Sequence, residues 1–451
     1  MTERILIRGG HVISMDPEIG DQPQTDILIE DDKIAAIGPD IGIGLEELAT
    51  THIIDATDRV VIPGFVDTHR HTWQACIRGC ASDATIDDYV AEILDTFAPH
   101  YRPEDVYAGN LAGALECLNA GITTLVDWSH INNTPDHPDA AIQALNETGI
   151  RAQYAYGSAS TSFADYWSES KIAMPAADVR RVKESYFESG SGLLTMALAT
   201  RGPGFCVPEV VRTEWRLAED LGLPITVHVA MGRLGRRYAM VKQLASMGLL
   251  RERTTYVHAC YLSDEEWRMV SDSGGTVSIA AQVELQMGHG WPPVMKAIEF
   301  GLEPGLSGDA VTVVPGDSFT QMRSAFAAER ARALSDQQAP ETLLTARDML
   351  TMATINGAKV AGLGNKTGSL TPGKQADVVL IDATALNIVP VTDPVAAVVL
   401  CADPSNVETV IVGGVIRKLD GHLLADTNRA RILVESSRDR LLRAAAAGTT
   451  T

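Results

Sequence analysis

Two histidines, His69 and His71, have a spacing that suits metal binding. They follow the apolar run that begins at Val60, and only Arg70 separates them. Alternate side chains of an extended strand lie on the same face, so the two imidazoles point to one side and are able to share a cation. An isolated pair of this kind is more often structural than metal-binding, so the rest of the chain decides its meaning.

Three further polar residues stand at the ends of short apolar segments: His228, His258 and Asp309. Imidazoles and one carboxylate are nitrogen and oxygen ligands that suit zinc or iron and leave room for a water molecule. A single histidine after a strand is usually structural, but polar groups that end four strands are hard to obtain by chance. The combination predicts a metal site.

The segments that carry these residues alternate with long helical stretches rich in Ala, Leu and Glu. This repeat predicts an α/β fold, a TIM-type (β/α)8 barrel over residues 61–367, whose catalytic groups lie at the C-terminal ends of the strands. The eight expected strands are Val60–Asp67, Thr123–Asp127, Ile150–Tyr156, Leu193–Thr200, Pro224–His228, Thr254–His258, Thr276–Ile279 and Gly305–Asp309.

Both ends of the chain have a different, hairpin-like rhythm. Residues 1–60 alternate in short apolar bursts, and the same rhythm returns over residues 368–426, with Gly413-Gly414 as a hairpin turn. We expect one small β-sandwich domain made from both ends, with the barrel inserted between its parts. Residues 427–451 are predicted to form a terminal helix and tail.

Three longer motifs carry a family resemblance. They are Asp67-Thr68-His69-Arg70-His71-Thr72-Trp73-Gln74 with Arg78-Gly79, then Ala353-Thr354-Ile355-Asn356-Gly357-Ala358, and Gly368-Ser369-Leu370-Thr371-Pro372-Gly373-Lys374-Gln375-Ala376-Asp377. With these motifs the chain resembles the amidohydrolase superfamily, specifically its branch of cytosine deaminase and the chlorohydrolase-like triazine hydrolases. The resemblance covers nearly the whole chain.

The resemblance implies a role for each candidate residue. The metal ligands would be His69, His71, His228 and Asp309, and His258 would hydrogen-bond the attacking hydroxide or the developing oxyanion. The expected ion is Zn2+, although Fe2+, Co2+ and Mn2+ tolerate the same ligands. Binuclear relatives carry a carboxylated lysine at the end of the fourth strand, where this chain has none, so one divalent metal ion is expected.

The chemistry follows from charge. A metal cation lowers the pKa of its bound water, so hydroxide is present near neutral pH and attacks an electrophilic carbon. As catalytic residues, Asp309 would pass the water's proton to the leaving nitrogen and His258 would stabilise the new negative charge. The predicted reaction is hydrolysis of a non-peptide C–N bond.

One departure from the branch concerns Met231. Deaminases of this branch carry a Glu three residues after the histidine that corresponds to His228, where it shuttles a proton to the substrate ring; here Met231 stands in that place. Methionine cannot carry a proton. This favours an amide, urea, carbamate or cyclic amide as substrate over a deaminase substrate, with the aminohydrolase reaction on a nitrogen heterocycle as the alternative.

Three polar residues are candidates to replace the missing acid: His130, Glu284 and His289. A hydrogen bond within a loop explains each of them about as well as a catalytic role. The glycines that flank His289 allow a ligand to come close, which favours substrate contact at that position.

Five further residues are predicted to contact substrate. Trp73, Trp128 and Trp291 each follow an expected barrel strand, and an aromatic or bulky apolar substrate would suit such walls, although packing of loops explains them equally well. Gln74 belongs to the first motif. Arg201 could pair with an anionic substrate group, and a structural salt bridge is the alternative.

Composition limits the partners. The formal net charge of −21 disfavours binding to nucleic acid and to anionic membranes, so a small-molecule substrate is expected. The start of the chain lacks the apolar core of a signal peptide, and the six cysteines form no Cys-x-x-Cys pair, which indicates a cytoplasmic protein with reduced thiols. The resemblance implies a homo-oligomer. A non-catalytic scaffold of this fold is the remaining alternative.

Overall fold

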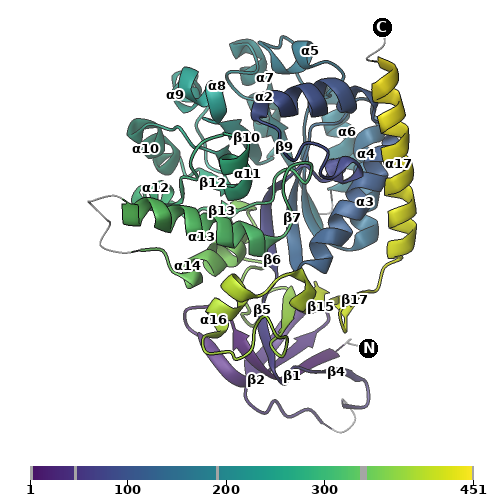
Figure 1. Cartoon of the computed structure of the whole chain (residues 1–451), viewed down its shortest axis with the longest axis vertical. Coiled ribbons are helices and arrows are strands. Elements are labelled where there is room, and N and C mark those ends of the chain that lie inside the picture. The colour runs from purple at the N-terminus through teal and green to yellow at the C-terminus, as the bar shows by residue number, and fades with distance from the viewer. Residues whose placement is uncertain (1–3, 45–47, 189–191, 336–342, 449–451) are drawn as a thin grey trace.

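Two sheets organise the molecule, which this computed structural model describes over residues 4–44, 48–188, 192–335 and 343–448 (Figure 1). The larger body contains eight parallel strands that neighbour one another in chain order. These strands are β6 Phe65–Arg70, β7 Ile122–Ser129, β8 Arg151–Tyr156, β9 Leu194–Thr200, β10 Ile225–Val229, β11 Thr254–His258, β12 Thr276–Ile279 and β13 Gly305–Leu306. The predicted barrel is confirmed.

Helices follow every barrel strand and cover its outer side (Figure 1). For example, α7 begins at Pro208, which fits the first turn of a helix, and ends before Gly222, whose φ of 62° terminates it. The segments after β6 are η1 Thr72–Ile77, α2 Ile86–Tyr89, η2 Val90–Phe97, η3 Ala98–His100 and α3 Pro103–Asn119. The later ones are α4 Asp136–Thr148, α5 Phe163–Trp167, α6 Ala176–Tyr186, α7 Pro208–Leu221, α8 Gly232–Arg237, α9 Met240–Ser246, α10 Asp264–Asp272, α11 Ala281–Gln286, α12 Val294–Glu299, α13 Ser318–Ser335, α14 Ala346–Thr351, η4 Met352–Asn356 and α15 Gly357–Val360.

The barrel closes where its first strand meets its last. The backbone N–H of Asp309 donates to the carbonyl of His69 at 2.9 Å, and the N–H of His71 donates to the carbonyl of Asp309 at 2.9 Å. Regular pairing in β13 ends at Leu306, so Asp309, which was predicted to end this strand, is reached through these two hydrogen bonds instead. Closure therefore brings three of the candidate ligands together.

The second sheet contains strands from both ends of the chain. Its order is β17-β16-β15-β14-β5-β1-β2-β3, and β4 also pairs with β1. The strands are β1 Arg4–Ile13, β2 Asp21–Glu30, β3 Lys33–Gly38, β4 Thr51–Asp55, β5 Arg59–Pro63, β14 Val378–Asp382, β15 Val407–Val412, β16 Val415–Leu419 and β17 His422–Leu423. The first half of β1 pairs with β4 and the second half with β5, so a single strand bends from one partner to the other at Gly9-Gly10.

The first expected strand, Val60–Asp67, is in fact two strands. Residues Arg59–Pro63 form β5 in the second sheet, and residues Phe65–Arg70 form β6 in the barrel. The chain passes from one sheet to the other at Gly64, where a Cβ would lie 2.0 Å from the Thr123 hydroxyl. Apolar periodicity continues across this glycine, so the pattern alone could not separate the two strands.

Other expectations for the chain ends agree with the structure. The Gly413-Gly414 turn joins β15 to β16 with positive φ at both glycines. The terminal helix is α17, Thr427–Gly448, which lies along the barrel beside α3, where Arg440 pairs with the buried Asp105 (Figure 1). The exact domain limits at residues 60, 367 and 426 stay a prediction.

Within the described ranges, no helix has the length and apolar character needed to cross a membrane.

A buried ion pair joins the barrel to the second sheet. Arg151, at the start of β8, donates to both oxygens of Asp377, at 2.7 and 2.9 Å. The same carboxylate also accepts from the Thr367 hydroxyl at 3.0 Å and from the Gly413 N–H at 2.7 Å. The carboxylate is fully buried and four hydrogen bonds reach it, so it is a fixed point between the two bodies.

We expect Asp377→Ala to destabilise the protein strongly, by about 3–5 kcal/mol, because the buried guanidinium of Arg151 would lose its charged partner and keep only the amide of Gln375. A lowered melting temperature in thermal unfolding would measure this. The control is Lys359→Ala, which removes an exposed pair with Glu303 and should cost at most about 1 kcal/mol. Equal melting temperatures for the two variants would contradict the prediction.

Candidate metal centre and active site

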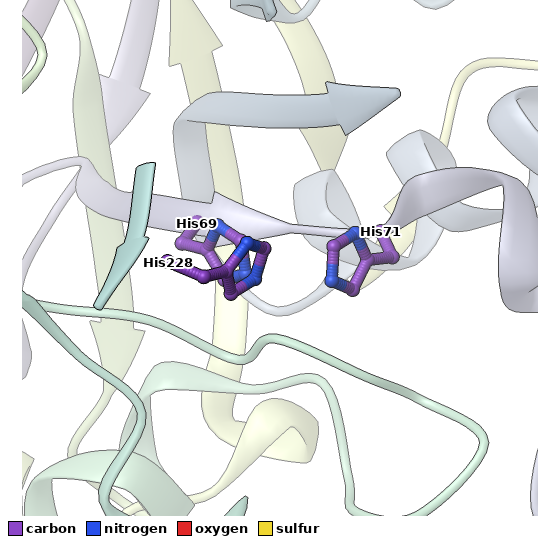
Figure 2. A group of neighbouring side chains, drawn as sticks. All are labelled: His69, His71 and His228. Atoms are coloured by element: carbon purple, nitrogen blue, oxygen red, sulfur yellow. The ribbon is translucent and has the colours of Figure 1, made fainter. Parts of the chain in front are cut away.

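The candidate ligands come from the C-terminal ends of three parts of the barrel. His69 lies in β6 and His71 directly after it, His228 lies in β10, and Asp309 follows β13. Figure 2 shows His69 and His71 side by side along one ribbon, with His228 reaching toward His69 from a different strand. All four side chains are buried.

The ligand atoms lie at distances that suit one cation. The Oδ1 of Asp309 is 3.3 Å from Nε2 of His69 and 3.4 Å from Nε2 of His71. Two ligands held at about 2.1 Å from a tetrahedral metal are separated by about 3.4 Å. His69, His71 and His228 also form a group whose ligand atoms all lie within 4.8 Å of one another, as do His69, His258 and Asp309.

The histidine shared by the two groups has no hydrogen bond of its own. His69 is fully buried, and neither ring nitrogen has a hydrogen-bond partner among the described residues; Asp309 approaches without hydrogen-bond geometry. A buried polar atom without a partner costs about 1–3 kcal/mol. A cation bound to a ring nitrogen of His69 would remove part of this cost, so the residues present fit a divalent metal.

Burial and neighbouring charges shift the pKa values of the candidate ligands toward the protonation states that metal binding requires. Burial lowers the pKa of His71 and His228 well below the ordinary value, and the neighbouring imidazoles lower it further, so both rings stay neutral as metal ligands must. Nδ1 of His71 lies 3.0 Å from the carbonyl of Trp128, which fixes the ring and leaves Nε2 for the metal. Burial alone would raise the pKa of Asp309, but His69, His258 and His71 hold it well below its ordinary value.

His258 is oriented from behind by Glu284. Nδ1 of His258 lies 3.2 Å from Oε1 of Glu284, and the N–H of Ala280 donates to the same oxygen at 2.8 Å. Nε2 of His258 then points toward Asp309, 3.8 Å from its Oδ2. The ring of His289 stacks on the ring of His258, with 4.7 Å between the two ring centroids. Glu284 therefore acts on His258 and does not line the cavity.

Backbone strain is concentrated at the same strand ends. His258, Asp309 and Ala230 have φ values of 71°, 55° and 51°. Such left-handed conformations cost non-glycine residues roughly 1–3 kcal/mol each and persist where the surrounding structure enforces them. At these positions the strain turns the side chains of His258 and Asp309, and that of Met231 after Ala230, toward the same space.

A cavity opens from this cluster to the surface. Its outer part has a volume of about 630 Å³ and includes Trp128, His130 and Met231 among its walls. A smaller inner part of about 40 Å³ lies against His71, His228, His258, His289 and Asp309, and Met231 borders both parts. Four of the residues that the sequence singled out, Trp128, His130, Met231 and His289, thus line the cavity.

The other predicted contacts lie elsewhere. Trp73 is fully buried and packs on Tyr101, and Gln74 is buried behind the cavity wall. Arg201 pairs with the buried Glu214 at 2.7 Å, which is the structural salt bridge that the sequence left open. Trp291 is 40% exposed and faces Arg332, away from the residues that line the cavity.

Several cavity residues carry no signal in the sequence. All of them lie in the loops and short helices that follow barrel strands. They are Tyr89, Phe163, Trp167, Phe205 and Tyr238. Two of their helices have a local sign: Thr85 and Asp88 form a capping box at the start of α2, which contains Tyr89, and Ser162 caps α5, which contains Phe163 and Trp167. These caps predict the helices but not the directions of the rings.

The model of the amidohydrolase family matches residues 60–417, so the chain belongs to this family. The class expected from the metal site and the barrel, a metal-dependent amidohydrolase, is thereby confirmed. The match covers the whole barrel and the strands β14 and β15 of the second sheet, and it ends within β16.

Particular relatives are deaminases and a chlorohydrolase. The 5-methylthioadenosine/S-adenosylhomocysteine deaminase of Pyrococcus furiosus is 27% identical, over 95% of this chain and 98% of its own. The 5'-deoxyadenosine deaminase of Methanosarcina mazei is 28% identical, over 96% and 95%. Among solved structures, an atrazine chlorohydrolase from Arthrobacter aurescens complexed with zinc has a TM-score of 0.84, with 23% identity over 96% of this chain and 100% of its own. A zinc-bound adenosine deaminase from Xanthomonas campestris has a TM-score of 0.82, with 21% identity over 97% and 98%.

We expect His228→Ala to lower the affinity for zinc by more than about 100-fold, since loss of even an outer partner of a ligand costs about 10- to 100-fold. Metal analysis after dialysis against a weak chelator would measure it. His422→Ala, which changes an exposed histidine on β17, is the control and should retain zinc. A His228→Ala protein with a full complement of zinc would contradict the assignment.

Proposed function

We propose that this chain is a mononuclear zinc hydrolase that cleaves the C–N bond of an amide, urea, carbamate or cyclic amide in a small aromatic or heterocyclic molecule. The observation that carries the proposal is the place of Met231, which borders the inner cavity together with His228 and Asp309. Every residue that would hold the metal is present, while the neighbouring side chain is a thioether that cannot donate a proton.

The cavity walls support an aromatic substrate. Trp128 lies with its ring centroid 4.4 Å from that of His228, and Trp167 and Phe205 extend the same wall outward. Apolar walls of this kind bury planar rings and exclude water. A volume of about 630 Å³ is in the range of pockets that hold drug-sized molecules.

The mechanism assigns a task to each side chain. A bound divalent cation would supply Lewis-acid activation of a water molecule. Asp309, which is ionised in its buried setting, accepts the proton of that water and delivers it to the leaving nitrogen. Burial raises the pKa of Glu284 well above its ordinary value, so its carboxyl donates to Nδ1 of His258. Nε2 then keeps its hydrogen and donates it to the negative charge that develops on the attacked group.

One metal ion is favoured over two by the end of β9. The strand ends at Thr200, and the next residue, Arg201, is held by Glu214 and by the carbonyls of Tyr166 and Ile172. A cationic side chain fixed in this way supplies no ligand for a second cation. A cytoplasmic location and a homo-oligomeric state stay predictions.

Hydrolytic deamination of a nitrogen heterocycle is the second candidate, and the names of the curated relatives favour it. In that reaction the leaving group is ammonia. It would require another group to protonate the ring in place of Met231, so the two candidates differ in a measurable product.

A substrate panel separates the candidates. We expect the zinc-loaded protein to hydrolyse members of a set of aryl amides, aryl ureas and cyclic amides, and to release no ammonia from 5'-deoxyadenosine, pterins or pyrimidines. Asp309→Asn should remove at least about 99% of turnover, since acid–base catalysis contributes about 10²–10⁴-fold. Ammonia from a heterocycle, with no amide or urea turnover, would reject the proposal, and an active Asp309→Asn protein would reject the role of Asp309.

A further inference from the structure

The phenol of Tyr89 lines the inner cavity. Tyr89 is the last residue of α2, its side chain is buried, and it borders both parts of the cavity. It shares the inner part with His71, Asp309 and Met231. The proposed mechanism uses no group from α2, so the function of this hydroxyl is open.

Gln74 determines what the phenol can do. Nε2 of Gln74 donates a hydrogen bond to the oxygen of Tyr89, and Oε1 of Gln74 accepts one from the Thr312 hydroxyl at 3.2 Å. The amide is fully buried between these two partners. Because the Tyr89 oxygen accepts from Gln74, its own hydrogen is left to donate, and no described residue accepts it.

The chain of hydrogen bonds is anchored on the metal-binding loops. Gln74 follows His71 by three residues in η1, and Thr312 follows Asp309 by three. The position of the phenol is therefore coupled to the same two segments that close the barrel. Burial also raises the pKa of Tyr89 well above its ordinary value, so the hydroxyl keeps its hydrogen.

We propose that Tyr89 is a catalytic residue that donates a hydrogen bond to the substrate atom beside the scissile bond, and that Gln74 is the residue that positions it. The inference rests on the proposed function and deepens it. Tyr89 supplies from α2 the polar contact that Met231 cannot supply from the end of β10. The donor strengthens its bond as negative charge develops on the substrate atom, and no proton needs to leave the phenol.

The surroundings of the phenol limit the substrate. Ile86, Met231 and Met287 border the inner cavity beside it. A charged substrate group placed against this apolar wall would lose its hydration, at a cost of several kcal/mol. The matching group is a neutral hydrogen-bond acceptor: the carbonyl oxygen of an amide, urea or lactam, or an unprotonated ring nitrogen.

The first test is Tyr89→Phe, which keeps the ring and removes only the hydroxyl. On the substrate found by the panel, we expect kcat of the zinc-loaded protein to fall about 10- to 100-fold, with KM changed less than about threefold and zinc content unchanged. Tyr107→Phe is the control, since Tyr107 bonds Glu147 and Arg429 on the surface and its loss should leave kcat unchanged. A Tyr89→Phe protein with wild-type kcat would overturn the inference.

The second test is Gln74→Glu, which keeps the shape but reverses the hydrogen bond. A carboxylate at position 74 accepts the hydrogen bond of the Tyr89 hydroxyl, which then no longer donates to the substrate. The kcat should therefore fall as in Tyr89→Phe, and the kcat of the double variant should fall no further. Full activity of Gln74→Glu would show that Tyr89 does not donate to the substrate.

The inference can be decided even if the proposed function is wrong. If the wild type deaminates a heterocycle instead, the same comparisons of kcat are made on that compound. Independently of turnover, benzamide provides a neutral carbonyl acceptor, and calorimetry should show about fivefold weaker binding to Tyr89→Phe, the cost of one hydrogen bond. Equal binding of benzamide by both proteins, or none by either, would overturn the inference.

Discussion

The site depends on the contact between the first and last barrel strands. Two backbone hydrogen bonds join Asp309 to His69 and His71, both at 2.9 Å, and they place the carboxylate beside both imidazoles. Arg70 stands between the two histidines in the chain, and its buried guanidinium is paired with Asp67 at 2.8 Å. The candidate ligands and this ion pair thus belong to the same strand, β6, which closes the barrel.

The closure also explains why the site is costly without a cation. Several imidazoles and one carboxylate are gathered where water is excluded, and one imidazole has no hydrogen bond to offset its burial. Left-handed backbone at His258 and Asp309 adds to this cost. The rest of the barrel, with its continuous apolar core, offsets these terms, so the fold can hold the side chains in a geometry that suits a metal ion.

The sequence was informative where geometry is periodic. His69, His71, His228, His258 and Asp309 could be placed because strand ends in a parallel barrel meet on one face. The split at Gly64 was missed because an apolar run does not show which sheet it joins. For Arg201 and Trp291 the sequence left a substrate contact and a structural role open, since a residue just after a strand can turn toward either the cavity or the surrounding helices; neither residue lines the cavity.

Tyr89 illustrates the limit most clearly. Its position depends on the path of about twenty residues after β6 and on the hydrogen bond from Gln74, neither of which has a period that can be read from the chain. The sequence predicted that Gln74 contacts substrate, but it did not show that its amide hydrogen-bonds the Tyr89 hydroxyl instead. Loop conformation therefore decides the polar half of the site, while strand order decides the metal-binding half.

The sheet made from both chain ends has a consequence for biosynthesis. β5 pairs with β14, and Pro63 lies opposite Val378, more than 300 residues later in the chain. At about 5–20 residues per second, a ribosome needs about 15–60 s to bridge that interval. During this time the edge of β5, with the apolar Val60, Val61 and Ile62, has no partner strand, and unpaired edges of this kind promote association between nascent chains. The enzyme's yield in a cell therefore depends on what shields this edge until β14 is synthesised.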